Sequence, residues 1–108
     1  MQLEKNRRGR ELRVVLSGEL DHHNAAIIRE EVDRELDGSV KLLTLDMSGI
    51  TFMDSSGIGV VLGRYRRMSE SGGKLRMGGM SIYAEKILRM AGVLALLILI
   101  GAGIGAYF

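Results

Sequence analysis

The sequence predicts an α/β fold, namely one domain with a mixed β-sheet in which a strand hairpin is followed by alternating helices and strands. Three observations favour it. The chain has 108 residues, 46% of them hydrophobic, which suits one domain with one core. Apolar stretches typical of strands alternate with apolar residues at helical spacing. No internal repeat or linker interrupts this order, so residues 1–108 are expected to form a single domain with largely parallel strands after the hairpin.

The composition excludes several classes of protein. The absence of cysteine excludes disulfides and cysteine-based zinc sites. A net charge of +2 with only 5% aromatic residues does not indicate a nucleic-acid partner. Residues 1–13 are charged and lack the apolar stretch of a signal peptide, so a cytoplasmic protein is expected.

Two strands are predicted around Gly9, over residues 2–8 and 10–17. The second alternates strictly, because Leu12, Val14 and Leu16 all face one side. The hairpin is basic, with Lys5, Arg7, Arg8, Arg10 and Arg13. A solvated edge that resists aggregation is the favoured interpretation, and a docking face for an acidic partner is the alternative.

A helix follows, capped by Asp21 or Asn24 and ended by Gly38. Its apolar face is predicted to contain Ala25, Ile28, Val32 and Leu36. Residues 40–47 form the most apolar strand, which indicates a central position in the sheet with both faces covered. A loop is expected over residues 48–51, after which Phe52 and Met53 pack under the edge of the domain.

The next helix is predicted from Ser55 to about Glu70. Its buried face is expected to contain Ile58, Val61, Leu62 and Tyr65, and its outer face Arg64, Arg66 and Arg67. A short strand over residues 74–78 follows. A last helix is capped by Ser81 and ended by Gly92, with Ala84, Ile87, Leu88 and Ala91 facing inward.

The C-terminal tail is unusual, because nineteen uncharged residues follow Arg89. In one interpretation, residues 94–100 form a buried strand and the rest is an apolar extension on the domain. In the other, the tail is a membrane anchor, since about 17–25 apolar residues suffice to span a bilayer. The first is favoured, because the preceding helix is needed to complete the sheet.

The stretch from Thr51 to Gly63 has the composition of a helix N-terminus that holds an anion or carries a modifiable hydroxyl. Asp54 precedes two serines, Ser55 and Ser56, and then the glycines begin. A capping acid accepts the first free N–H groups, and the helix dipole makes this end locally positive. A phosphate at such a position gains both contributions.

Other chemistries fit less well. A serine hydrolase would need a base for Ser55 from His22 or His23, and the nucleophile-elbow motif is absent. Adjacent histidines diverge, so no metal site is predicted. The glycines at 57, 59 and 63 resemble a dinucleotide loop only loosely, and close packing of the helix on the sheet explains them better. No catalytic residue, metal or cofactor is therefore expected.

Two motifs carry a family resemblance over roughly residues 2–93. They are Gly18-Glu19-Leu20-Asp21-His22-His23 and Phe52-Met53-Asp54-Ser55-Ser56-Gly57-Ile58-Gly59, the latter followed by Leu62-Gly63-Arg64-Tyr65. With this spacing the chain resembles the STAS-domain anti-sigma factor antagonists, especially those of the sporulation sigma-F system. The resemblance implies a mixed sheet with helices on one side.

The resemblance also implies a function. The protein would bind an anti-sigma factor that is itself a serine kinase, and so release the sigma factor. The kinase would phosphorylate Ser55 and a phosphatase would restore it, so the protein is a substrate and not an enzyme. Asp54, Ser56 and Gly57 belong to the same motif, and Asp21 would lie nearby on the partner-facing end.

Arg64 and Arg67 are further candidates for partner contacts, from the expected outer face of their helix. The uncharged tail departs from the family, which usually ends in an amphipathic helix. It motivates the alternative of a STAS module in another partner-switching system, either stress-related or linked to a membrane.

Overall fold

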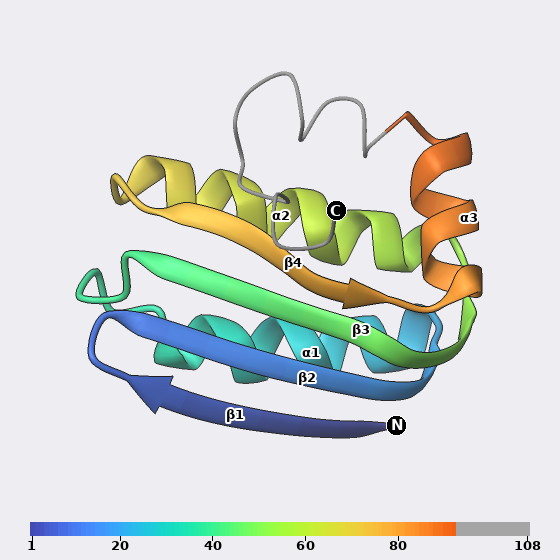
Figure 1. Cartoon of the computed structure of the whole chain (residues 1–108), viewed down its shortest axis with the longest axis horizontal. Helices are drawn as coiled ribbons and strands as arrows, with labels where there is room; N and C mark the ends of the chain where they lie inside the picture. The colour runs from blue at the N-terminus through green and yellow to red at the C-terminus, as the bar shows by residue number, and fades with distance from the viewer. Residues whose placement is uncertain (93–108) are drawn as a thin grey trace.

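The computed structural model describes residues 1–92, which form one four-stranded sheet and three helices (Figure 1). Along the chain these are β1 (Gln2–Arg8), β2 (Glu11–Leu20), α1 (His22–Glu35), β3 (Leu42–Met53), α2 (Ser55–Glu70), β4 (Lys74–Met80) and α3 (Ile82–Met90). The strand order is β1-β2-β3-β4, with β1 antiparallel to β2 and the other two pairs parallel. The predicted mixed sheet is therefore confirmed.

The two inner strands are longer than predicted. β2 continues three residues past Ser17, and β3 continues through residues 48–51, where a loop was expected. The loop prediction is wrong because the second half of β3 pairs with β2 through two register shifts, with Gly49 opposite Ser17 and Met53 opposite Leu20. A Cβ on Gly49 would lie 2.7 Å from the Cβ of Ser17, so glycine permits this close approach.

The core lies between one face of the sheet and helices α1 and α2, which Figure 1 shows side by side behind the strands. All four apolar residues predicted for the inner face of α1 are buried. The buried face of α2 differs from the prediction, since it consists of Gly57, Val60, Val61, Arg64 and Met68. Of the predicted residues only Val61 is fully buried, while Ile58, Leu62 and Tyr65 pack around the margin of the core.

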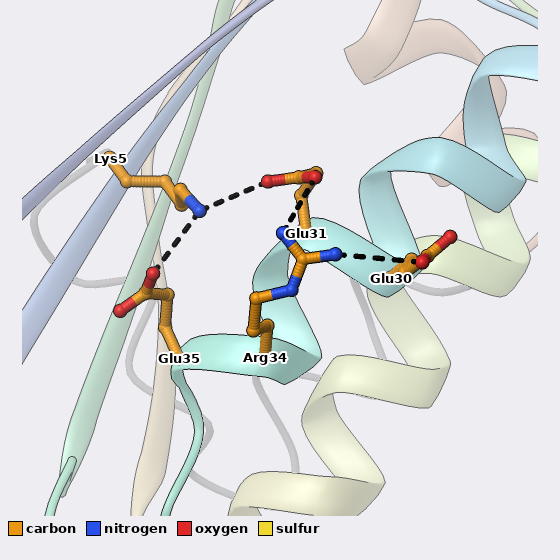
Figure 2. A network of polar contacts seen from close by, with 5 residues as sticks. All are labelled: Lys5, Glu30, Glu31, Arg34 and Glu35. Carbon is orange, nitrogen blue, oxygen red and sulfur yellow. Dashed lines mark hydrogen bonds and ion pairs between the residues drawn. The ribbon is translucent and has the colours of Figure 1, made fainter.

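Part of the basic hairpin is paired within the domain. Lys5 Nζ of β1 lies 3.1 Å from Glu31 and 3.2 Å from Glu35, both on α1 (Figure 2). The hydrogen bond to Glu31 and then that to Glu35 raise the pKa of Lys5, and the bond from Lys5 lowers the pKa of Glu31. This network ties the edge strand to the helix layer, whereas Arg8 and Arg10 are solvated as predicted.

Helix α3 packs against β3 and β4 beside their carboxyl ends, and Ser81 caps it as predicted. Ala84 and Leu88 are buried, but Ala91 is exposed, contrary to prediction. Within residues 1–92 no helix is long and apolar enough to cross a bilayer. Both interpretations of the tail, the strand over residues 94–100 and the membrane anchor, concern residues 93–108 and lie outside the described part of the chain.

Candidate functional site at two helix N-termini

The first turns of α1 and α2 meet at the carboxyl ends of β2 and β3. Leu20 and Met53 are partners in the parallel ladder, and each is followed directly by an aspartate. The Asp54 N–H also donates to the Leu20 carbonyl at 3.3 Å. The parallel register therefore places Asp21 and Asp54 next to each other, as expected from the sequence.

Both aspartates are N-caps with extended backbones. Asp54 Oδ1 accepts from the Ser56 N–H at 2.8 Å, and its carbonyl accepts from the Gly57 N–H at 3.0 Å. Asp21 Oδ1 accepts from the Asn24 N–H at 2.9 Å, which identifies Asp21 rather than Asn24 as the cap. Each helix thus begins directly after its strand, at a capping aspartate that the sequence already contains.

Ser55 is the first residue of α2 and its side chain is exposed, while Ser56 beside it is half-buried. A hydroxyl here is open to an external enzyme. A phosphoryl group attached to it would lie near the N–H groups and the positive end of the helix dipole, which favour an anion. It would also lie beside the carboxylates of Asp54 and Asp21, which repel it.

Gly57 follows the two serines in the sequence and is buried. A Cβ at this position would lie 2.6 Å from both Cγ and Cε of Met53. Gly57 therefore lets the first turn of α2 pack tightly onto the end of β3. The packing explanation is correct for Gly57 but wrong for Gly59 and Gly63 as far as residues 1–92 are concerned, since an added Cβ at either would meet none of their atoms within 4 Å.

Arg64 does not lie on the outer face of α2, contrary to prediction. Its side chain is only 7% exposed and lies between α1 and α2, where Nε is 2.9 Å from Asp33 Oδ1 and Nη2 donates to Oδ2 at 3.3 Å. Burial lowers the pKa of Arg64 despite the opposing charge of Asp33. The long side chain turns inward because a carboxylate on the neighbouring helix is within reach.

Arg67 is half-exposed, as expected for the outer face, but it too contacts α1. Its Nη2 donates to the Leu36 carbonyl at 2.9 Å, at the end of that helix. Arg66 is exposed. The arginines proposed together from the sequence thus occupy three different environments.

Phe52 is a residue that sequence reasoning placed wrongly. It was expected to pack with Met53, but it is 48% exposed while Met53 is buried. Because β3 extends to this point, neighbouring side chains alternate between its faces, and only one of the two can enter the core. Strand alternation up to the cap would have indicated that Phe52, three residues before Ser55, is exposed.

Two other chemistries gain no support from these contacts. Both histidines lie exposed on the first turn of α1, and within residues 1–92 no hydrogen bond joins either to Ser55. In the same part of the chain no group of three or more His, Cys, Asp or Glu side chains is placed to hold a metal ion.

The model of the STAS domain family matches residues 2–103 of the chain. The chain belongs to the STAS domain family. This STAS domain is 34% identical over 94 residues to an anti-sigma F factor antagonist of Paenibacillus polymyxa, covering 86% of the chain and 80% of that relative. It is 26% identical over 80 residues to an anti-sigma-B factor antagonist of Bacillus subtilis, covering 74% and 70%.

Solved structures agree with the fold of this STAS domain. The anti-sigma factor antagonist SpoIIAA in its unphosphorylated form superposes with a TM-score of 0.76 at 26% identity, covering 93% of the chain and 97% of SpoIIAA. The phosphorylated form of SpoIIAA from Bacillus gives a TM-score of 0.72 at 28% identity, covering 87% and 86%. The relative of known structure thus exists in two phosphorylation states.

Proposed function

We propose that this STAS domain is an anti-sigma factor antagonist that phosphorylation of Ser55 switches off. It binds an anti-sigma factor that is also a serine kinase and thereby releases a sigma factor in the cytoplasm. The kinase phosphorylates Ser55, binding weakens, and a serine phosphatase restores the free hydroxyl. The chain acts as the regulated substrate rather than as an enzyme.

One observation carries this proposal, namely the exposed hydroxyl of Ser55 at the first position of α2, beside two capping aspartates. A phosphoserine carries about −1.5 to −2 charges at neutral pH. The helix N-terminus tolerates this charge, so the domain need not refold. The switch instead changes the charge and bulk of a surface on which a partner docks.

The proposed partner surface consists of Asp21, Asp54 and Ser56 around the modified residue, with Arg67 further along α2. Gly57 supports it from beneath by allowing the first turn to pack on Met53. Arg64 is left out of the direct contacts, because its guanidinium is buried between the helices.

Intact-mass analysis tests the switch. The wild type, Ser55→Ala and Ser56→Ala are incubated with ATP and the anti-sigma F factor of Paenibacillus polymyxa. We expect one added phosphate in the wild type and in the Ser56→Ala control, and none in Ser55→Ala. Ser55→Ala should still bind the kinase, whereas Ser55→Asp should bind at least about tenfold more weakly, because about 1.4 kcal/mol of lost binding suffices.

Two outcomes would refute the switch. One is phosphate on Ser55→Ala, which would place the modification elsewhere. The other is equal binding of the kinase by the wild type and Ser55→Asp, which would mean that a negative charge at Ser55 does not weaken binding.

A second candidate is an antagonist in a stress-related partner-switching system. The similarity to the anti-sigma-B factor antagonist of Bacillus subtilis favours it. A side-by-side binding measurement with the anti-sigma F and anti-sigma-B factors of the two relatives' species distinguishes the systems. Preference for the second factor by tenfold or more would select this alternative.

A further inference from the structure

An arginine cluster lies on the face where α1 and α2 pack against each other. It consists of Arg29 on α1 with Arg64 and Arg67 on α2, grouped around Asp33 of α1. Asp33 Oδ1 lies 2.9 Å from Arg64 Nε and 4.0 Å from Arg67 Nε, and Arg29 precedes Asp33 by one helical turn.

The cluster carries more positive charge than its own carboxylate balances. Arg29 and Arg67 both lower the pKa of Arg64, after the larger effect of burial, because the three guanidinium groups repel one another. Within residues 1–92 Arg29 has no hydrogen bond or ion pair. The buried Nη1 of Arg64 also lacks a hydrogen-bond partner in that part of the chain, whereas its Nε forms the ion pair with Asp33 without the geometry of a hydrogen bond.

The neighbouring acids of α1 are engaged elsewhere. Glu30 and Glu31 pair with Arg34, and Glu31 also accepts from Lys5, as Figure 2 shows. Asp33 therefore pairs with Arg64 and Arg67, and among residues 1–92 no carboxylate pairs with Arg29. Arg29 and the half-exposed Arg67 present donors to solvent.

Within the described part of the chain, no side chain covers the surface of α2 at the two glycines between Ser55 and this cluster. Gly59 and Gly63 follow Ser55 at intervals of four residues, and among residues 1–92 no atom lies within 4 Å of a Cβ added at either. A glycine inside a helix costs about 1 kcal/mol relative to alanine, and no packing against residues 1–92 requires these two. A chain bound near Ser55 can therefore reach Arg67 without meeting a side chain at either glycine.

We propose that Arg29 and Arg67 form a docking site for a carboxylate side chain of the anti-sigma factor, with Arg64 adding positive charge from beneath. The inference rests on the proposed function and names a second contact of the same surface. A protein carboxylate fits better than a nucleic acid or a lipid surface, because the cluster is small and flanked by the exposed Glu30.

Charge reversal with a matched control tests this site. Binding of the anti-sigma F factor of Paenibacillus polymyxa is measured by calorimetry for the wild type, Arg29→Glu, Arg67→Ala and Arg10→Glu. Arg10 is an exposed hairpin residue, so Arg10→Glu changes the net charge equally and away from the site. Arg29 is also exposed, and circular dichroism checks that each variant keeps the wild-type fold.

We expect Arg29→Glu to raise the Kd by about tenfold and Arg67→Ala by about threefold, with the control within twofold. Added salt should weaken the wild type more than Arg29→Glu, because screening acts on the charge pair. If both cluster variants bind within twofold of a wild type that binds and is phosphorylated, the docking site is wrong and the proposed function stands. If the wild type neither binds nor accepts phosphate, both are wrong.

Discussion

Gly57 and Gly59 lie two residues apart on α2, yet only Gly57 approaches another part of the domain closely. The site for a Cβ on Gly57 is filled by Met53, whereas the site on Gly59 has no neighbour within 4 Å among residues 1–92. At the scale of single residues, glycine thus permits close packing at position 57, whereas at position 59 it leaves the surface of α2 without a side chain.

This difference predicts opposite effects of two alanine substitutions. Gly57→Ala should destabilise the domain by about 1–3 kcal/mol, because the methyl group would displace the buried side chain of Met53. Gly59→Ala should stabilise it by up to about 1 kcal/mol through helix propensity. Urea denaturation of both variants measures this, and an equal gain at the two positions would contradict the packing of Gly57 on Met53.

At the scale of elements, polar contacts of α2 arginines hold α1 and α2 together. Arg64 reaches Asp33 and Arg67 reaches the carbonyl of Leu36, so two residues one turn apart bind the second half of α1. The N-termini of the same two helices carry Asp21 and Ser55. Fixing the far halves of the helices therefore also fixes the geometry of the candidate site.

In the Arg64–Asp33 ion pair the arginine is more deeply buried than the aspartate, so removing either residue should change stability by a different amount. Asp33→Ala should lower the free energy of unfolding by about 1–3 kcal/mol, because it leaves a buried guanidinium without its carboxylate. This loss is smaller than for a fully buried ion pair, because Asp33 is partly exposed. Arg64→Met should cost less, since water and Arg67 can still satisfy Asp33. Thermal unfolding of the two single variants and the double variant tests this. A larger loss of stability in Arg64→Met than in Asp33→Ala would contradict the prediction.

At the scale of the whole molecule, a polar network connects three strands on the sheet face opposite α1 and α2. Glu11 accepts from Thr44 and Arg76, and Arg13 donates to Asp46 at 2.7 Å. It links β2, β3 and β4 by side chains in addition to the backbone ladder. It therefore supports the alignment that brings the ends of β2 and β3 together.

Asp46 gives this network a pH dependence. Burial alone would raise the pKa of Asp46, but hydrogen bonds from Ser48 and the charge of Arg13 together lower it below 3.8. A carboxyl group whose pKa is lower in the folded state than in the unfolded state stabilises the fold at pH values above its unfolded-state pKa. This stabilisation is lost as the pH falls through the folded-state pKa.

Wild type should therefore be more stable than Asp46→Asn at pH 6, and the difference should shrink below about pH 4. Urea midpoints at pH 6, 4 and 3 measure it, with Asp37→Asn as a second carboxyl variant for comparison, since Ser39 lowers the pKa of Asp37 in the same direction. If the stability difference between wild type and Asp46→Asn grows as the pH falls, the predicted pH dependence is wrong.

The sequence by itself determined the order of helices and strands between residues 2 and 92, the caps at Asp54 and Ser81, and the position of a serine at the first turn of α2. These features depend on residues within a few positions of one another, such as apolar periodicity and a capping side chain.

Tertiary structure decided the features that depend on residues about thirty positions apart. Pairing with β2 turned an expected loop into the end of β3 and exposed Phe52. Asp33 drew Arg64 into the interior, so the buried face of α2 differs from its hydrophobic pattern. Long-range ladders and ion pairs are set by the packing of separate elements, and local sequence patterns do not contain that information.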